Sequence, residues 1–515
     1  MAGPERLFPA RILLFCVLAA WPSIPSDAGE PPDGTVFRVE TAPRDESHVD
    51  QIGHQIYNEG TRGRVPFMRP DGTIILIDRN KFFLDEILRL PPWLHLGLQH
   101  RDRYESYNEP FRKGETTGAQ QVALQTLAQF GIRYDPIRVY AELIDARALA
   151  TTGITVTNQM EDVTDLLQLS AGLGTSHVLG LDVPAELKVG RFTMDVSHRR
   201  LIGRNQFRNT INAFQGFHGT LGHEQDWHLR AFLVRPVLRF QTTLDQPDAG
   251  TVFWGALLGQ QRISWLRTEV YGFVLREKEQ VHSSVGIADE ATIQGQRENL
   301  NTVGVRLFKP RALREFDYEI ESDWQFGRSS LQTGSPVLTT LAHFQHVEVG
   351  YTLPLPGTPH VLLQYDYASG DKNPTDNRNG RFDTLFGVRN FEFGPPGIWG
   401  PFFRSNISSP GYQITIKPLN KIFFLFRHRI WWLAQSRDQW VGSGLQDPSG
   451  RAGNYLGHTI EPRLQWVFNP NVQIELGWVY LIKGSFIERL REQGVAGVPN
   501  DQNVSYTFVQ TVFTF

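Results

Sequence analysis

Acidic side chains occupy alternate positions of one apolar segment in this 515-residue chain. Between Phe316 and Phe326 the intervening residues are mostly aromatic or aliphatic, and the acidic row is Asp317, Glu319, Glu321 and Asp323. A period of two indicates a β-strand with one apolar and one polar face. A row of carboxylates on one face can pair with cations or line a polar passage.

The same alternation runs through residues 457–481, on both sides of a tight turn at 469–471. The apolar face of this predicted hairpin ends in Trp478 and Tyr480, and its polar face carries Arg463 and Glu475. A soluble sandwich would bury the apolar face in a core, whereas a membrane barrel would turn it toward lipid and keep charges inside. In a barrel, Arg463 and Glu475 could form a cross-strand ion pair.

The composition favours the barrel. Mean hydropathy is -0.30, and beyond the N-terminus no stretch is apolar enough for a lipid-spanning helix. A membrane barrel is compatible with this value, because the apolar residues of its strands alternate with polar ones. The 12 Trp and 34 Phe residues suit aromatic girdles at membrane surfaces. The polar faces carry Arg rather than Lys, and Arg suits packed pairing with carboxylates. The net charge of -3 gives no sign of a nucleic-acid partner.

We therefore predict an all-β fold, a transmembrane antiparallel up-and-down β-barrel. Roughly seventeen alternating segments are present, and because single-chain barrels prefer an even number we expect 16 or 18 strands. Short connections at 418–420 and 469–471 interleave with long polar loops at 369–408 and 435–455. This asymmetry is typical of short periplasmic turns and long outer loops. Residues Asp162–Leu169 are expected to form a short helix inside a long insertion.

Three regions are expected along the chain. Residues 1–28 have the basic start, short apolar stretch and small residues of a secretory signal peptide cleaved near Ala28. Residues 29–91 form a flexible leader, with one strand-like stretch at 73–77 and a short helix at 82–90. Residues 92–515 hold the barrel. The only cysteine, Cys16, lies in the signal peptide, which excludes disulfides and thiol chemistry from the mature chain.

The chain ends in Phe515 on a final alternating strand. This ending resembles the signal that the outer-membrane assembly machinery reads, so that machinery is a predicted partner. Outer-membrane lipid and lipopolysaccharide are expected to surround the apolar face. The predicted location is the outer membrane of a Gram-negative-type cell.

Arginines take the polar positions of other segments, and a basic run at 187–204 adds more. The arginines expected to line the bore and bind solute are Arg101, Arg103, Arg138, Arg191, Arg199, Arg200, Arg230, Arg306, Arg427, Arg429 and Arg463. If basic and acidic strands face each other, the field across the bore is transverse; if the arginines cluster, the bore attracts anions. Alternatively, about half of these charges only pair across strands and brace the wall.

Arg191 falls on the apolar parity of its segment. Either Gly190 forms a β-bulge that turns Arg191 inward, or Arg191 lies past the edge of the bilayer. We expect the bulge.

Several motifs resemble the alginate export family of outer-membrane porins. They include Pro92-Trp93-Leu94, Arg138–Leu149, Arg200-Leu-Ile-Gly203 and Tyr365–Asp371, and the resemblance covers roughly residues 92–515. It implies an 18-stranded barrel whose arginine-rich bore conducts anionic polysaccharide out of the periplasm. One departure is Phe192 after Gly190-Arg191, where the family would have Gln.

Signals for other chemistry are weak. Asp195 and His198 lie close in sequence but lack an evident nucleophile, and the histidines lack metal-ligand spacing. The segment Asp371–Gly380 lacks the central glycine and final glutamate of a calcium loop. We therefore predict no catalytic residues, metal or cofactor.

The leading hypothesis is a passive outer-membrane channel that exports an anionic, alginate-like polysaccharide or oligosaccharide. A general or nutrient-uptake porin of the same fold is the alternative, and an outer-membrane hydrolase is the third.

Overall fold

The computed structural model describes residues 64–68, 74–78, 84, 88–91, 93–178, 180–278, 297–330, 335–419, 421–469 and 471–515. The predicted signal peptide, most of the leader, most of the helix expected at 82–90, and the turn residues Asn420 and Pro470 lie outside the described residues. Strands β1 (Arg64–Met68) and β2 (Ile74–Asp78) form an antiparallel hairpin. The strand-like stretch expected at 73–77 is therefore confirmed.

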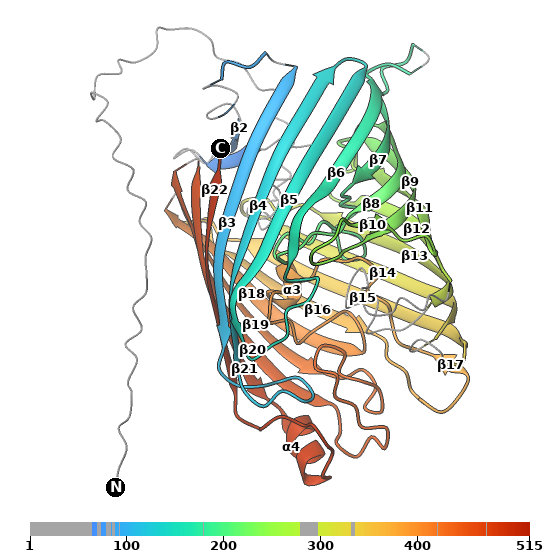
Figure 1. The fold of residues 1–515 in the computed structure, drawn as a ribbon, viewed down its shortest axis with the longest axis vertical. Coiled ribbons are helices and arrows are strands. Elements are labelled where there is room, and N and C mark those ends of the chain that lie inside the picture. Colours follow the sequence, from blue (N-terminus) through green and yellow to red (C-terminus); the bar gives the residue numbers. More distant parts are fainter. Residues whose placement is uncertain are drawn as a thin grey trace. The chain divides into compact units, whose positions relative to one another are not determined.

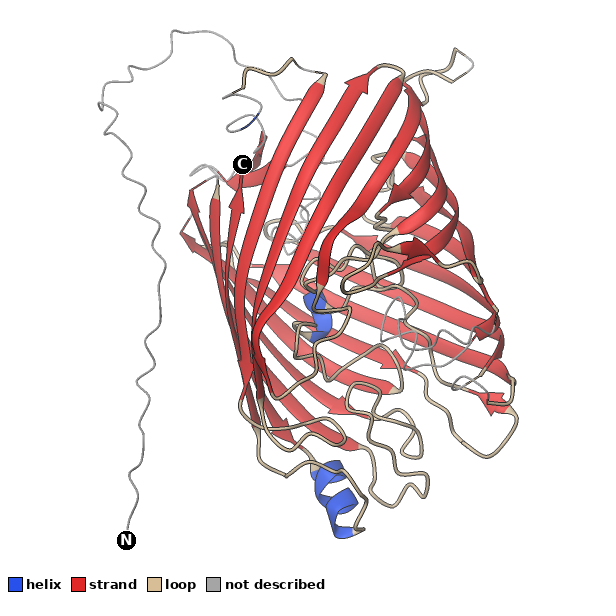
Figure 2. Cartoon of the chain, viewed as in Figure 1, coloured by secondary structure: helices blue, strands red, loops and turns tan. Residues whose placement is uncertain are grey.

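Among the described residues, eighteen strands of 8 to 16 residues close into one antiparallel barrel (Figures 1 and 2). They are β3 (Leu94–Tyr107), β4 (Ala119–Tyr134), β5 (Ile137–Thr152), β6 (Asp162–Thr175), β7 (Ala185–Phe192), β8 (Phe214–Gly222), β9 (Trp227–Leu238), β11 (Thr251–Gln260), β12 (Arg267–Glu277), β13 (Arg297–Lys309), β14 (Phe316–Ser329), β15 (Leu338–Thr352), β16 (His360–Ala368), β18 (Ile407–Leu419), β19 (Ile422–Trp432), β20 (Tyr455–Asn469), β21 (Val472–Lys483) and β22 (Val504–Thr514). The barrel closes where β22 pairs with β3. The predicted fold and the count of 18 are confirmed.

Alternation along each strand separates an outer apolar face from an inner polar face. On β14 the outward residues Phe316, Ile320 and Trp324 are 65%, 43% and 47% exposed, whereas the four acidic residues between them are buried. Exposed apolar side chains recur on strands all around the barrel. Such a surface is far larger than soluble proteins tolerate, so it is the lipid-facing surface.

Short and long connections alternate between the two edges of the barrel. Short turns such as 135–136 and 223–226 share one edge with the start of β3 and the end of β22. Long loops, including 193–213, 369–406, 433–454 and 484–503, lie at the other edge, and the last carries helix α4 (Ser485–Glu492). The predicted loop asymmetry is confirmed. Among the described residues, the helices are too short or too polar to cross a membrane.

Two local predictions are wrong. Asp162–Leu169 begins strand β6 rather than a helix. Register shifts in the β5–β6 pairing disturb the alternation, so that Asp162, Asp165 and Gln168 are buried at a helix-like spacing of three. The expected bulge at Gly190 is also not observed, because neither pairing of β7 shows a register shift. Gly190 instead has φ +127°, and a Cβ there would lie 2.3 Å from the Leu169 carbonyl oxygen.

Two of the long loops fold into the barrel, and their residues are mostly buried apart from a partly exposed stretch at 372–378 (Figure 2). We call residues 193–213 inner loop A and residues 369–406 inner loop B. Inner loop B contains the two-residue strand β17 (Arg378–Asn379) and helix α3 (Asn390–Phe393). Its aromatic side chains pack on the inner face of the wall, where Phe402 stacks on Trp431 with ring centroids 3.8 Å apart and Trp399 stacks on Tyr506.

Candidate functional site

A basic arc of the inner wall is built by strands β19 to β22 and β3, which are consecutive neighbours. Arg101 and Arg103 come from β3, Arg427 and Arg429 from β19, and Arg463 from β20. All five are buried on the inner face. Period-two alternation predicted the inner position of these residues correctly, because they share the parity opposite to the outward-facing residues of their strands.

The acidic row lies across the barrel from β3. Asp317, Glu319, Glu321 and Asp323 on β14 are at most 6% exposed. Eight steps from neighbour to neighbour separate β14 from β3 in a barrel of eighteen strands, so the two strands are nearly opposite. The structure combines the two charge arrangements that the sequence left open, because the arginines cluster in the basic arc and the acidic row lies nearly opposite β3.

A central ion cluster joins the acidic row to both inner loops. Arg200 of inner loop A pairs with Glu319 and Glu321 of the wall and donates from Nε to Glu392 Oε1 of inner loop B at 2.9 Å. Arg404 pairs with the second Glu392 oxygen. We define the central ion cluster as Arg200, Arg404, Glu319, Glu321 and Glu392. Each member is at most 4% exposed, so these charges are stabilised chiefly by one another.

The charges of the loop residues in this cluster are strongly coupled. Burial opposes ionisation of Glu392, but Arg200 and Arg404 outweigh it and hold the pKa of Glu392 well below its usual range. Burial likewise opposes the charge of Arg200, yet Glu319 and Glu392 keep the pKa of Arg200 well above its usual value. Both side chains are therefore ionised over the whole neutral range.

Inner loop A rests against the arginines of β3. Arg101 donates to the carbonyl oxygens of Gln206 and Arg208, the second at 3.0 Å. Arg103 donates to the Phe207 carbonyl and stacks over its ring, with 4.2 Å from the guanidinium carbon to the ring centroid.

Inner loop B rests in the same way against β19 and β20. Arg427 donates to the Phe391 carbonyl, and Arg463 to the Asn390 carbonyl at 3.3 Å. Arg429 lies 3.4 Å from the Glu392 carbonyl and pairs with Asp366. The wall arginines thus hold oxygen atoms of the protein's own inner loops.

The remaining predicted arginines lie outside the basic arc, and one of them, Arg306, pairs with a member of the central ion cluster. Arg306 of β13 pairs with Glu269 and Glu319, and Arg199 lies over the Phe391 ring at 5.4 Å. Arg138 pairs with Glu186 and Arg230 with Glu224, both near the short-turn edge. Arg191 donates to the carbonyl oxygens of Leu166 and Asp245 and is not part of the central cluster.

The predicted hairpin pair is confirmed. Arg463 Nη1 lies 3.7 Å from Glu475 Oε1 across β20 and β21, and Arg463 also pairs with Glu461. This arginine therefore braces the wall as well as holding inner loop B.

Sequence reasoning missed the loop residues that complete the interior. Arg204 makes two hydrogen bonds to Glu142, at 2.8 and 2.9 Å, and Arg381 pairs with Asp438. Glu392 and Arg404 were also missed. The basic run at 187–204 signalled Arg204, but loops lack the periodicity that would have indicated a partner.

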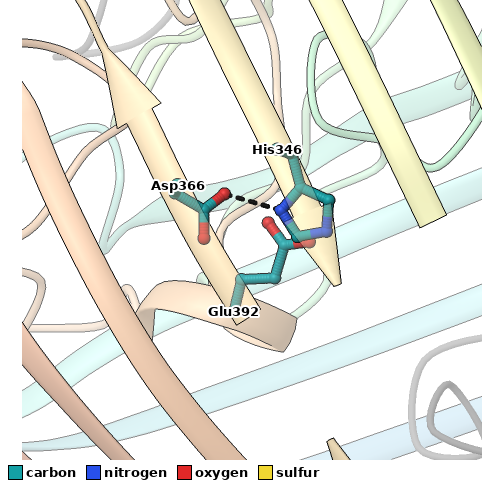
Figure 3. Close-up of side chains that lie close together, drawn as sticks. All are labelled: His346, Asp366 and Glu392. Atoms are coloured by element: carbon teal, nitrogen blue, oxygen red, sulfur yellow. Dashed lines mark hydrogen bonds and ion pairs between the residues drawn. The ribbon is translucent and has the colours of Figure 1, made fainter. Parts of the chain in front are cut away.

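His346, Asp366 and Glu392 converge in the bore and could hold a metal ion by spacing alone (Figure 3). However, His346 Nδ1 lies 2.8 Å from Asp366 Oδ1, and Arg429 takes the other Asp366 oxygen. Arg200 and Arg404 occupy both oxygens of Glu392. With its carboxylates already paired to guanidinium groups, this trio is an ion-pair centre that extends the central cluster.

Residues 92–496 match the alginate export family. Among solved structures, OccK8 (OprE) of Pseudomonas aeruginosa aligns with a TM-score of 0.55 at 10% identity, covering 82% of this chain and 98% of that chain. OccD3 (OpdP) of the same species aligns at 0.53 and 11%, covering 82% and 91%, and OccAB1 of Acinetobacter baumannii at 0.53 and 11%, covering 82% and 97%. At these identities the likeness concerns the fold. No curated protein matches the sequence.

Proposed function

Because this chain belongs to the alginate export family and folds as an outer-membrane barrel, we propose that it is a gated channel for an anionic polysaccharide or oligosaccharide. Its path runs along the basic arc of β3, β19 and β20. The observation that carries this proposal is that the arginines of the arc already bind a row of oxygens, which belong to the inner loops.

Carboxylate oxygens are better partners for these guanidinium groups than backbone carbonyls. A charge-assisted hydrogen bond is roughly twice as strong as a neutral one, and Arg binds carboxylate through two parallel bonds. A polyuronate strand can therefore replace the loop carbonyls once the inner loops leave the bore. In this proposal the observed arrangement, with both inner loops inside the barrel, is the closed state.

A second candidate function is that of a general or nutrient-uptake porin, in which the same barrel takes up small or oligosaccharide solutes. It is favoured by the transverse charge arrangement, with the acidic row of β14 nearly opposite Arg101 and Arg103. Opposed charges across a constriction orient and sort small solutes. A hydrolase has less support, because Asp195 accepts the Arg204 backbone N–H at 2.8 Å and His198 contacts Glu319.

The surroundings of the channel follow from its outer face. The exposed apolar side chains suit lipid and the lipid part of lipopolysaccharide. Phe515 exchanges backbone hydrogen bonds with Leu98 of β3 at the short-turn edge. This position suits recognition of the last strand by the assembly machinery during insertion.

The proposal is tested by selectivity in planar bilayers. Arg101, Arg427 and Arg429 are changed together to Gln, which keeps hydrogen-bond donors but removes charge. The control is Arg147→Gln, because Arg147 is half exposed and pairs only locally with Asp145. Under a salt gradient the triple variant should lose anion preference, and a soluble oligouronate should no longer block its current. The control should behave as wild type.

Each result has a defined meaning. An unchanged reversal potential in the triple variant would show that the basic arc does not set selectivity. Block by a neutral oligoglucoside as strong as block by an oligouronate would favour the small-solute porin instead.

A further inference from the structure

Part of the barrel wall at the long-loop edge is made by a loop rather than by strands. Strands β7 and β8 have 8 and 9 residues, whereas their neighbours β6 and β9 have 14 and 12. Residues 239–245 follow β9 and contact β6 before the chain returns to pair with β9 as the two-residue strand β10 (Gln246–Pro247). Val163 of β6 donates to the Gln241 carbonyl at 3.0 Å, and Gln241 Nε2 donates to the Val156 carbonyl at 3.2 Å.

Three carboxylates meet where this segment joins β6. Asp162 and Asp165 belong to β6 and are 2% and 3% exposed, and Asp245 belongs to the bridging segment. Each offers an oxygen within 4.8 Å of the other two. Oxygen ligands lie about 2.4 Å from a Ca²⁺ ion. Two such oxygens on opposite sides of the ion are therefore about 4.8 Å apart, which is the limit met here.

The three carboxylates differ in how well the protein satisfies them. Asp165 accepts the backbone N–H groups of Leu166 and Asp245 and lies 3.9 Å from Arg191. Asp245 Oδ1 accepts the Phe240 N–H at 2.8 Å. Asp162 Oδ1 is fully buried and has no hydrogen-bond partner. An unpartnered buried carboxylate oxygen is costly, so it points to a ligand that the fold is built to receive.

The local charge also calls for a cation. Two guanidinium groups are present nearby: Arg191 contacts Asp165, and Arg239 donates to Asn212 at 2.8 Å. When all three carboxylates are ionised, they exceed the two guanidinium groups by one negative charge. The donors are oxygens alone, a set that suits Ca²⁺ and does not suit zinc or copper.

We propose that Asp162, Asp165 and Asp245 bind a calcium ion that fastens residues 239–245 to β6 and completes the wall above β7 and β8. The long-loop edge faces the exterior in barrels of this kind, where Ca²⁺ is available. The ion satisfies the free oxygen of Asp162 and removes the repulsion among the three carboxylates.

The test uses the full chain, purified in detergent and treated with a chelator. Calorimetric titration with Ca²⁺ should show saturable binding of one ion per chain, and added Ca²⁺ should raise the melting temperature and slow proteolysis within 239–250. Mg²⁺ should do this poorly, because it demands tighter octahedral geometry. Asp162→Asn should abolish the binding and the Ca²⁺-dependent rise in melting temperature.

Controls separate loss of the site from misfolding. Asp501→Asn removes one exposed carboxylate from another long loop and should retain wild-type binding. In chelator, Asp162→Asn and Asp245→Asn should melt at or above the wild-type temperature, because each removes a repelling charge. Wild-type protein that binds no Ca²⁺, or an Asp162→Asn variant that binds it unchanged, would overturn the proposal.

Discussion

Replacing Arg200 by Met should release the inner loops. Arg200 is the one residue of the central ion cluster that contacts the wall and inner loop B together, and Met keeps much of its length without the charge. In this variant Glu319 would still pair with Arg306, and Glu392 would still pair with Arg404. Glu321 would lose its guanidinium partner and retain the hydroxyl of Tyr271 at 2.8 Å.

The size of the effect follows from the burial of these groups. Removing one partner of a buried ion pair costs about 3–5 kcal/mol, because the other charge stays buried without compensation. When the loops leave, water can reach these carboxylates, so most of this cost falls on the closed state. Since every 1.4 kcal/mol is tenfold, the open fraction should rise by roughly two to three and a half powers of ten, up to full opening.

Single-channel recording in planar bilayers measures the open fraction directly, and protease cleavage in 193–213 measures loop release. Arg138→Met is the control, because Arg138 pairs with Glu186 on the wall and contacts neither inner loop. Adding Glu321→Gln to Arg200→Met should recover part of the closed state, since it removes the orphaned charge. A variant that stays closed to ions and resists protease as wild type does would refute the role assigned to the cluster.

Three further predictions concern the inner loops and the lipid-facing wall. Because the pKa of Glu392 is lowered in the folded chain, its stabilisation is complete above the usual value of 4.5 and is lost only as pH falls through the lower, folded value. Conductance should therefore stay low from neutral pH to about 5 and rise only in stronger acid; opening between pH 7 and 5 would contradict this. Phe402→Ala should destabilise inner loop B by about 3–5 kcal/mol, because it removes the buried stack on Trp431, and protease should then cut within 369–406. Val347→Arg, on the lipid face of β15, should cost about 2–4 kcal/mol in urea unfolding from lipid vesicles, whereas Val347→Leu should cost little.

The local periodicity of the sequence determined much of the fold of this protein. Which face of each strand meets lipid depends only on parity, so the sequence placed Arg103, Glu319 and Arg463 inside without knowledge of their partners. The same pattern predicted 16 or 18 strands and the alternation of short and long connections. Prediction from periodicity failed where the strand pairing is irregular, as at Asp162–Leu169, because bulges change which residues of a strand face inward.

Only the tertiary structure decided that inner loops A and B lie in the bore. Arg200 and Glu392 are 192 residues apart, and both lie in segments without periodic patterning. Their meeting depends on the closure of the whole barrel, which brings β14 and the two inner loops to one place. The same closure sets the acidic row nearly opposite Arg101 and Arg103. Parity fixes the side of the wall on which a charge lies, but the partner of that charge is a property of distances across the barrel.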